Sequence, residues 1–214
     1  MMVLHTFVGS PNGRKVETVI RHLGLAVEIV YHDFFHGALR TPEFRALNAN
    51  GQVPVLIDGP FVLWESNAII QYLADRAGDD ALFPRDPQRR ADVVRWLCWE
   101  QVHFNKAFGT LGFEAVAKPK FGLGVTNPAL VAWAQEELAR RAPVLEAHLA
   151  GRDVVVGDTV TLADYALVKL EAYRAPAPFD WSPYRRINDY FDRIRQLGPW
   201  VGTEPAVIRE PVEA

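Results

Sequence analysis

Residues 48–76 read NANGQVPVLIDGPFVLWESNAIIQYLADR, and this segment is the most informative about the fold of the first part of the chain. Pro54 enters the short apolar run of residues 55–57. Because proline cannot donate to a strand ladder, its position predicts a cis Val53–Pro54 bond at the entrance to a strand. Such a turn would present the N–H and C=O of Val53 to an extended, peptide-like ligand.

The same stretch continues with a second strand and a helix. Asp58-Gly59 is typical of a hairpin turn, after which a strand would end at Trp64. Glu65 and Ser66 then begin a helix. A serine beside the unpaired N–H groups of a helix start can bind a carboxylate, and the preceding glutamate can accept from an ammonium. We therefore expect one site that recognises a backbone amide, a carboxylate and an amine.

The residues before this stretch extend the pattern. Residues 3–8 predict a strand, and the apolar spacing of residues 16–23 predicts a helix that stops at a glycine. Residues 27–31 alternate as a second strand, and residues 41–47 predict a short helix with Thr41 as its cap. The order strand, helix, strand, helix, hairpin, helix (βαβαββα) suits an α/β thioredoxin-like domain.

The first helix opens with Ser10-Pro11-Asn12-Gly13, and the turn contains no cysteine. Redox members of the thioredoxin-like fold carry Cys-x-x-Cys there, so their dithiol chemistry is absent. A hydroxyl and an amide remain at the positive end of a helix, where they could hold a thiolate that a ligand carries.

These motifs together resemble the glutathione-binding half of a glutathione transferase, of the bacterial theta- or nu-like type that holds the thiol with serine or asparagine. The resemblance implies Ser10 or Asn12 as the catalytic group, and the sequence leaves both open. It also implies glutathione as co-substrate, a homodimer, and a small electrophile or disulfide as second substrate. The glutathione-binding residues that the resemblance implies are Gln52, Val53, Pro54, Glu65, Ser66 and Arg40, the last in place of a histidine that relatives carry near Leu39.

The rest of the chain predicts an all-α C-terminal domain. We expect a glutathione-binding domain over residues 1–77, a polar, proline-containing linker over 78–88, and helices over 89–214. Long helices are predicted at about 89–117 and about 128–150 from their apolar periodicity. Thr161-Leu162-Ala163-Asp164 predicts a capping box and resembles the buried capping motif of the transferase C-terminal domain.

Three aromatic residues of the first long helix admit two interpretations. Phe104, Phe108 and Phe113 could line a second-substrate pocket beside the thiol, or they could be core residues. Cys98, the single cysteine, is expected to be a buried apolar residue. His5, His22 and His103 lack partners at ligand spacing, so no metal site is expected.

Composition narrows the function classes. The 214 residues are 49% hydrophobic with a net charge of −3, which gives no bias toward nucleic acid. No apolar run approaches the roughly 18 residues of a membrane helix, and no export signal is evident, so cytoplasmic residence is expected. The expected function is glutathione transfer to a small electrophile; the alternatives are a glutathione-dependent disulfide reductase or peroxidase, and a noncatalytic interaction protein on the same fold.

Overall fold

A computed structural model of the chain describes residues 1–203, which divide into two compact units. The first unit contains residues 1–80 and, among the last residues described, 198–203; the second contains residues 81–197. Each unit is built around its own core of buried apolar side chains.

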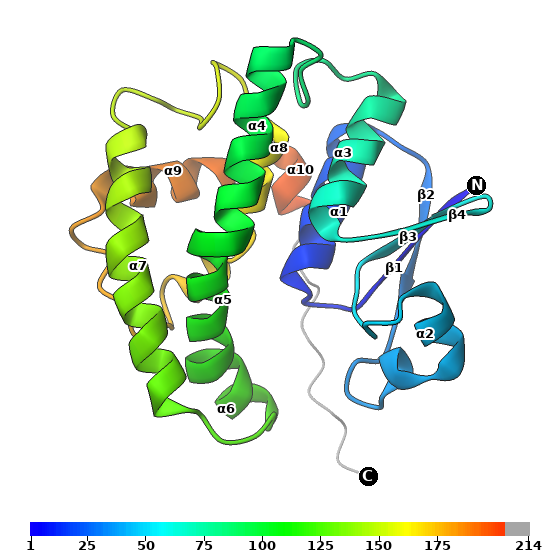
Figure 1. Cartoon of the computed structure of the whole chain (residues 1–214), viewed down its shortest axis with the longest axis horizontal. Helices are drawn as coiled ribbons and strands as arrows, with labels where there is room; N and C mark the ends of the chain where they lie inside the picture. Colours follow the sequence, from blue (N-terminus) through cyan, green and yellow to red (C-terminus); the bar gives the residue numbers. More distant parts are fainter. Residues whose placement is uncertain (204–214) are drawn as a thin grey trace. The chain divides into compact units, whose positions relative to one another are not determined.

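The N-terminal unit has the predicted thioredoxin-like order, with a four-stranded sheet in the order β2-β1-β3-β4 (Figure 1). Strand β1 pairs with β2 in parallel and with β3 antiparallel, and β3 pairs antiparallel with β4. The elements are β1 (Met2–Thr6), α1 (Pro11–His22), β2 (Val27–Tyr31), a 3-10 turn (Ala38–Arg40), α2 (Pro42–Leu47), β3 (Val55–Asp58), β4 (Phe61–Trp64) and α3 (Ser66–Ala77).

The core of this unit forms where α1 and α3 contact each other and the sheet supplies apolar side chains. Because both helices repeat their apolar residues every three or four positions, each has one inward face. The buried side chains include Leu4, Leu56, Val16, Val19, Ile69, Ile70 and Leu73, all fully inaccessible to solvent.

The register of the sheet brings three chain segments to one edge. His5, near the end of β1, pairs with Val55 at the start of β3, and Val55 pairs with Trp64 at the end of β4. The end of β1 leads into α1, and the end of β4 leads into α3. The starts of both helices and the turn before β3 therefore lie at the same edge.

The second unit is helical, as predicted, but its first long helix is not continuous. Two single π-helical turns interrupt it, so the expected helix over 89–117 is divided. Each π turn takes in an extra residue and rotates the following side chains around the axis. The elements are α4 (Pro87–Trp99), π turns (Glu100–Phe104 and Phe113–Ala117), α5 (Asn105–Gly112), α6 (Lys118–Phe121), α7 (Pro128–His148), α8 (Leu162–Val168), a 3-10 turn (Glu171–Tyr173) and α9 (Arg185–Ile194).

The predicted capping box is confirmed and serves as a polar centre of this unit. The carboxylate of Asp164 is fully buried and accepts hydrogen bonds from the N–H and the hydroxyl of Thr161 at 2.8 and 3.1 Å. It also accepts from Val155 N at 3.0 Å and from the hydroxyl of Tyr190 at 2.9 Å. Asp164 therefore joins α8, α9 and the loop before α8.

The boundaries between the units differ from those expected. Residues 81–86, assigned to the linker, pack onto the helical unit, where Leu82 O accepts from Leu162 N at 3.1 Å. Helix α10 (Gly198–Val201), expected in the helical domain, instead contacts α1 of the N-terminal unit. The guanidinium of Arg14 lies 4.1 Å from the centre of the Trp200 ring, which explains this attachment. The remainder of the predicted C-terminal domain, residues 204–214, lies outside the described residues.

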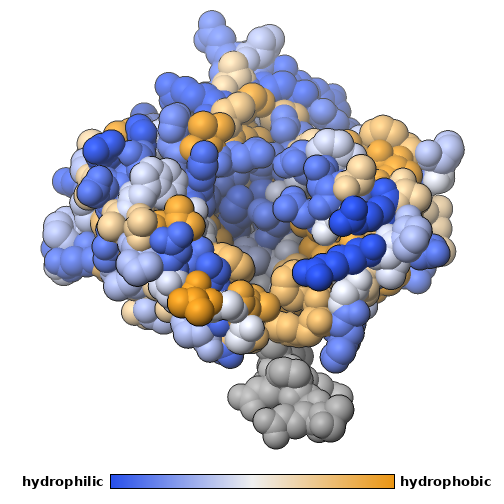
Figure 2. Space-filling view, turned by 60° about the horizontal axis from the view of Figure 1, so that its bottom comes forward, coloured by the Kyte–Doolittle hydropathy of each residue, from blue (hydrophilic) through white to orange (hydrophobic). Residues whose placement is uncertain are grey.

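The surface differs from the expectation at the single cysteine. Cys98 is exposed, so the prediction of a buried cysteine is wrong: it lies on the solvent side of α4. Hydrophobic residues are interspersed with hydrophilic ones on the face drawn in Figure 2. Within residues 1–203, no helix combines the length and the apolar character needed to span a membrane.

Candidate functional site

Ser10 begins helix α1 and is almost completely buried, with 5% of its surface exposed. Its Oγ accepts a hydrogen bond from Gly13 N at 3.1 Å, the usual contact of a serine N-cap. The hydroxyl hydrogen does not take part in that bond, so Ser10 can still donate to an anion. The cap thus fixes the orientation of a potential donor at the positive end of α1.

Asn12 and Ser66 link the first turns of the two helices that begin at this edge. The hydroxyl of Ser66 donates to Asn12 Oδ1 at 3.3 Å. Because Oδ1 accepts this bond, the amide Nδ2 group of Asn12 is left to donate elsewhere. The sequence placed both residues at helix starts, and the fold brings them into contact across 54 positions of the chain.

Glu65 has an unusual backbone. It precedes α3 with a φ of 74°, the one positive φ among the described residues other than glycine. A non-glycine residue in this region costs on the order of 1–3 kcal/mol, and such strain clusters at binding sites. The carboxylate is exposed at the helix start, next to Ser66.

A buried lysine beneath these helix starts escaped the sequence analysis. Lys15 of α1 is fully buried, and its Nζ donates to Asn67 Oδ1 of α3 at 2.5 Å. A cation enclosed near two helix N-termini adds to a positive potential at this edge. The sequence position of Lys15 indicates its direction, because Lys15 precedes the buried Val19 by four residues and so lies on the inward face of α1. Because lysine is rarely fully buried, this spacing alone does not predict a buried Lys15.

The Val53–Pro54 bond is cis, as predicted. Asn48, buried to 4% exposure, stabilises the preceding loop, since its Nδ2 donates to Gln52 O at 2.7 Å. Its Oδ1 accepts from Asn50 N at 3.0 Å. Asn48 is a second residue that the sequence analysis did not assign, although asparagine commonly ties loops in this way.

Arg40 ends the 3-10 turn before α2 and is exposed, whereas its neighbour Leu39 packs in an apolar cluster with Phe44 and Val55. The Leu39 side chain therefore contributes packing. The role of Arg40 toward a ligand carboxylate stays a prediction.

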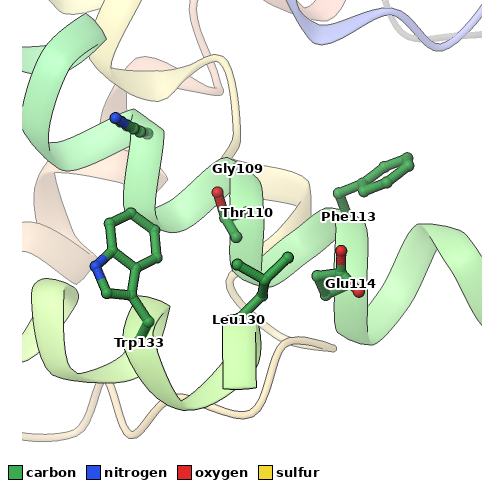
Figure 3. Close-up of a pocket in the computed structure, with 7 residues that line it drawn as sticks. Gly109, Thr110, Phe113, Glu114, Leu130 and Trp133 are labelled. Atoms are coloured by element: carbon green, nitrogen blue, oxygen red, sulfur yellow. The ribbon is translucent and has the colours of Figure 1, made fainter. Parts of the chain in front are cut away.

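The structure separates the three phenylalanines of the expected second-substrate pocket. Phe104 and Phe108 are fully buried, with their ring centres 6.1 Å apart, so they belong to the core. Their interpretation as pocket-lining residues does not fit the described conformation. Phe113 is 43% exposed and lines an open pocket of about 590 Å³ in the helical unit (Figure 3).

The histidines form a pair that the sequence did not indicate. His5 Nδ1 and His32 Nε2 lie 2.8 Å apart on neighbouring strands β1 and β2, at hydrogen-bonding distance. Burial lowers the pKa of both imidazoles, and the proximity of His32 lowers that of His5 further. Within residues 1–203, no group of three or more histidine, cysteine, aspartate or glutamate side chains could hold a metal ion.

Comparison with known proteins agrees with this arrangement. Residues 4–81 match the family model of the glutathione S-transferase N-terminal domain, and residues 104–197 match that of the C-terminal domain. Glutathione S-transferase 3 of Zea mays is 40% identical over 175 residues, which cover 79% of this chain and 78% of that protein. A glutathione S-transferase of Hyoscyamus muticus is 32% identical over 201 residues, covering 93% and 91%.

Solved structures give the same result. The apo form of glutathione S-transferase III superposes with a TM-score of 0.83 at 32% identity, covering all of this chain and 98% of that one. The glutathione transferase URE2P6 of Phanerochaete chrysosporium, in complex with oxidised glutathione, has a TM-score of 0.83 at 26% identity, covering 94% of each chain. With both domains matched and both folds present, this chain belongs to the glutathione S-transferase family.

Proposed function

We propose that this chain is a glutathione transferase that stabilises the glutathione thiolate for attack on a small electrophile. The observation that carries the proposal is the contact between Ser66 and Asn12, because it joins the starts of α1 and α3 into one polar edge. Glutathione offers a peptide backbone, two carboxylates, an ammonium and a thiol, and we propose a partner for each among the residues of the N-terminal unit.

The binding arrangement follows from the chemistry of those groups. The γ-glutamyl carboxylate would accept from Ser66 and the N–H groups of the first turn of α3. Its ammonium would donate to Glu65, and the cysteinyl backbone would pair with Val53 at the turn formed with Pro54 and Gln52. Arg40 would receive the glycine carboxylate. A solved structure of glutathione S-transferase I is bound with lactoylglutathione, which supports glutathione as the ligand class.

The chemical step needs a thiolate. A free thiol has a pKa of about 8.5, so at neutral pH little of it is ionised. Hydrogen bonds from Ser10 and Asn12, together with the positive end of α1, favour the anion over the thiol. The proton leaves to solvent, and the sulfur forms a bond to an electrophilic carbon while a leaving group departs with the bonding electrons. No covalent bond to the protein is required.

A second candidate is glutathione-dependent reduction of disulfides or peroxides on the same site. The Ser-Pro-Asn-Gly turn favours it, since this turn resembles that of relatives with such activity. In that reaction, one glutathione thiolate would attack a disulfide sulfur, form a mixed disulfide and release one substrate thiolate. A second glutathione thiolate would then attack the glutathione sulfur of the mixed disulfide, which releases the other substrate thiolate and leaves oxidised glutathione. A noncatalytic role is disfavoured by the presence of Ser10, Asn12, Glu65 and Ser66 together.

A substrate panel distinguishes these reactions. Electrophiles such as 1-chloro-2,4-dinitrobenzene, together with disulfides and peroxides, would be assayed with glutathione in a Cys98→Ser background, because Cys98 is the one cysteine and is exposed. We expect conjugation that depends on Asn12 or Ser10. Reduction without conjugation would favour the second candidate, and glutathione binding without turnover of any class would exclude both.

A further inference from the structure

The first turn of α1 lies so close to the end of β1 that the helix has no room for a side chain at Gly13. Gly13 follows the cap residue Ser10 by three positions, and Thr6 is the last residue of β1. A Cβ atom added to Gly13 would lie 1.9 Å from Thr6 Oγ1 and 3.1 Å from Thr6 Cβ. The backbone of Gly13 is helical, so glycine is required here by the lack of space and not by a positive φ.

Thr6 is a fixed part of the sheet. It is fully buried, it pairs with Tyr31 of β2, and its carbonyl accepts from His32 N at 2.7 Å. Because threonine is branched at Cβ, its side chain is stiff and has little freedom to turn away from the helix. The first turn of α1 therefore takes its position from Thr6.

The size of the Thr6 hydroxyl suits this contact. The hydroxyl is buried and has no hydrogen-bond partner among the described residues, so hydrogen bonding does not explain a threonine here. Since a Cα–Cβ bond is about 1.5 Å long, Thr6 Oγ1 lies within about 3.4 Å of Gly13 Cα. Two carbon atoms pack best at about 3.5–4.0 Å. An oxygen therefore fits where the methyl group of a valine would press on the helix.

The contact acts on Ser10 through the helix cap. Ser10 N donates to Phe7 O at 3.1 Å, which ties Ser10 to the loop after β1. On the helix side, Gly13 N donates to Ser10 Oγ at 3.1 Å, and Arg14 N donates to Ser10 O at 2.8 Å. If Gly13 were pushed away from Thr6, the helix would move while the loop held Ser10. The bond that orients the Ser10 hydroxyl would then lengthen or break.

We propose that Thr6 and Gly13 are positioning residues for the glutathione thiolate. Their contact sets how closely the first turn of α1 approaches β1, and thereby the direction in which the Ser10 hydroxyl donates. The inference rests on the proposed function, in which Ser10 stabilises the thiolate, and it adds two residues that act through Ser10.

The first test adds the missing side chain and then removes the atom that it meets. Gly13→Ala should raise the midpoint of the thiolate titration of bound glutathione by about one pH unit, a tenfold change in the ionisation constant. The double variant that combines Gly13→Ala with Thr6→Ala should recover most of that shift. In Gly13→Ala, kcat at neutral pH should fall by a larger factor than KM for glutathione rises, because the proposed γ-glutamyl contacts lie on α3.

Two conservative variants of Thr6 separate size from hydrogen bonding. Thr6→Ser keeps the oxygen and should leave the titration unchanged. Thr6→Val puts a methyl group in its place, so it should shift the midpoint in the same direction as Gly13→Ala. Thr6→Val also tests the contact if Gly13→Ala does not fold.

A second measurement needs no glutathione, so it distinguishes failure of this inference from failure of the proposed function. Ser10→Ala should lower the denaturant midpoint of the unmodified chain, because it removes the N-cap. In the Gly13→Ala background it should lower the midpoint much less, since the cap bond is already disturbed, and adding Thr6→Ala should restore the difference. Gly109→Ala in α5 is the control, because the nearest atom there is Leu170 Cδ1 at 3.4 Å and no coupling to Ser10 is expected.

The inference would be overturned by either of two results. One is an equal loss of stability on Ser10→Ala with and without Gly13→Ala. The other is a shift of the thiolate titration in Gly13→Ala that Thr6→Ala does not relieve. If the coupling in stability is present but Ser10→Ala leaves the titration unchanged, the role of Ser10 in the proposed function is wrong, and the contact positions only the helix cap.

Discussion

At the scale of single residues, the candidate site depends on side chains that use one atom for a hydrogen bond within the protein and keep another for a ligand. Ser10 uses a lone pair to cap α1 and retains its O–H, and Asn12 uses Oδ1 for Ser66 and retains its amide donor. Glu65 holds its carboxylate at the start of α3 with a backbone that glycine would adopt more easily. These three residues therefore allow function and stability to be separated by substitution.

Replacing Glu65 by glycine or by alanine should weaken glutathione binding in both cases, but the glycine variant should be the more stable of the two. Glu65→Ala and Glu65→Gly both remove the carboxylate, so each should weaken glutathione binding by on the order of 1.5–3 kcal/mol through loss of a charged hydrogen bond. Glycine adopts a positive φ without the steric strain that alanine has there, so Glu65→Gly should unfold at a higher denaturant concentration than Glu65→Ala. Calorimetry and denaturant titration measure the two effects, and unchanged glutathione affinity in both variants would contradict the role of Glu65.

Ser10 and Asn12 should both influence the thiol pKa of bound glutathione, and Ser10 should have the larger effect. Its hydroxyl is nearly buried, where a hydrogen bond to an anion is stronger than in water. Loss of one preorganised donor costs roughly 2–4 kcal/mol in favourable cases. The ultraviolet absorbance of the thiolate of bound glutathione can be titrated against pH. The midpoint of that titration should therefore shift to higher pH in Ser10→Ala, and by a smaller amount in Asn12→Ala.

If neither substitution changes the titration curve, neither side chain stabilises the thiolate. The backbone N–H groups at the start of α1 would then be its stabilisers. Ser10→Ala should also lose about 1 kcal/mol of stability with the N-cap. Asn12→Ala, which caps no helix, serves as the comparison for that loss.

At the scale of elements, polar contacts join neighbouring segments that hydrophobic packing alone would leave less defined. The histidine pair links β1 and β2, with the Phe44 ring of α2 5.0 Å from that of His32. The Asp164 carboxylate joins α8 to α9. The histidine pair depends on the protonation of half-buried rings, and the Asp164 contacts depend on the hydrogen bonding of a buried carboxylate. Each can be tested by substitution.

The N-terminal unit should lose stability as the pH falls through the histidine range. The pKa values of His5 and His32 are lower in the folded state, so the unfolded chain binds more protons below about 6.5, the ordinary pKa of histidine. Stability should therefore rise with pH, and the melting temperature should be lower at pH 5.5 than at pH 7.5. Glu28 opposes the shift of His5 but does not reverse it.

His5→Asn should reduce this pH dependence, because it removes one of the two titrating rings. His36→Asn is the control, since His36 is exposed and pairs with Asp33. Identical melting profiles for His5→Asn and the unmodified chain at both pH values would show that the pair does not titrate on unfolding.

Asp164→Ala should destabilise the helical unit strongly. The substitution leaves the N–H groups of Val155 and Thr161 without their acceptor in a fully buried place, and each costs about 1–3 kcal/mol. We expect a loss of about 3 kcal/mol in denaturant unfolding. Asp158→Ala, at an exposed position in the loop before α8, should change stability by less than about 0.5 kcal/mol.

At the scale of the whole molecule, the chain divides into a unit that carries the glutathione-site candidates and a unit that carries the Phe113 pocket. Family resemblance predicts a homodimer, and the aromatic-rich first long helix, with Trp96, Trp99 and His103, supplies candidate surface for it. Trp96 proves to be 5% exposed and packs against Trp99 and His148, so it is not a surface residue. Val102, at 59% exposure, is the more accessible apolar residue of that segment.

Light scattering at micromolar concentration should report about 48 kDa, twice the 24.0 kDa of one chain. The apolar side chain of Val102 provides candidate contact area, so Val102→Lys should favour the monomer. Val125→Lys is a matched control, because Val125 is 90% exposed in the loop after α6. A mass of one chain at all concentrations tested would contradict the dimer.

Features that depend on local stereochemistry could be predicted from the sequence. The cis turn at Pro54, the N-caps at Ser10 and Thr41 and the capping box at Asp164 each follow from what a few adjacent residues can adopt. The thioredoxin-like order follows in the same way, because turn residues and apolar periods mark each element.

Which of these residues come into contact depends on long-range packing and could not be predicted from the sequence. The contact of Asn12 with Ser66 and the burial of Lys15 depend on how two helices pack on one sheet, which no local pattern specifies. Phe113 follows Phe108 by five residues, a rotation of about 500° that directs it away from the core side, and only the packing of α7 turned that exposed face into a pocket. Local sequence patterns do not say which face of a helix will be buried against which neighbour, because long-range contacts determine that choice.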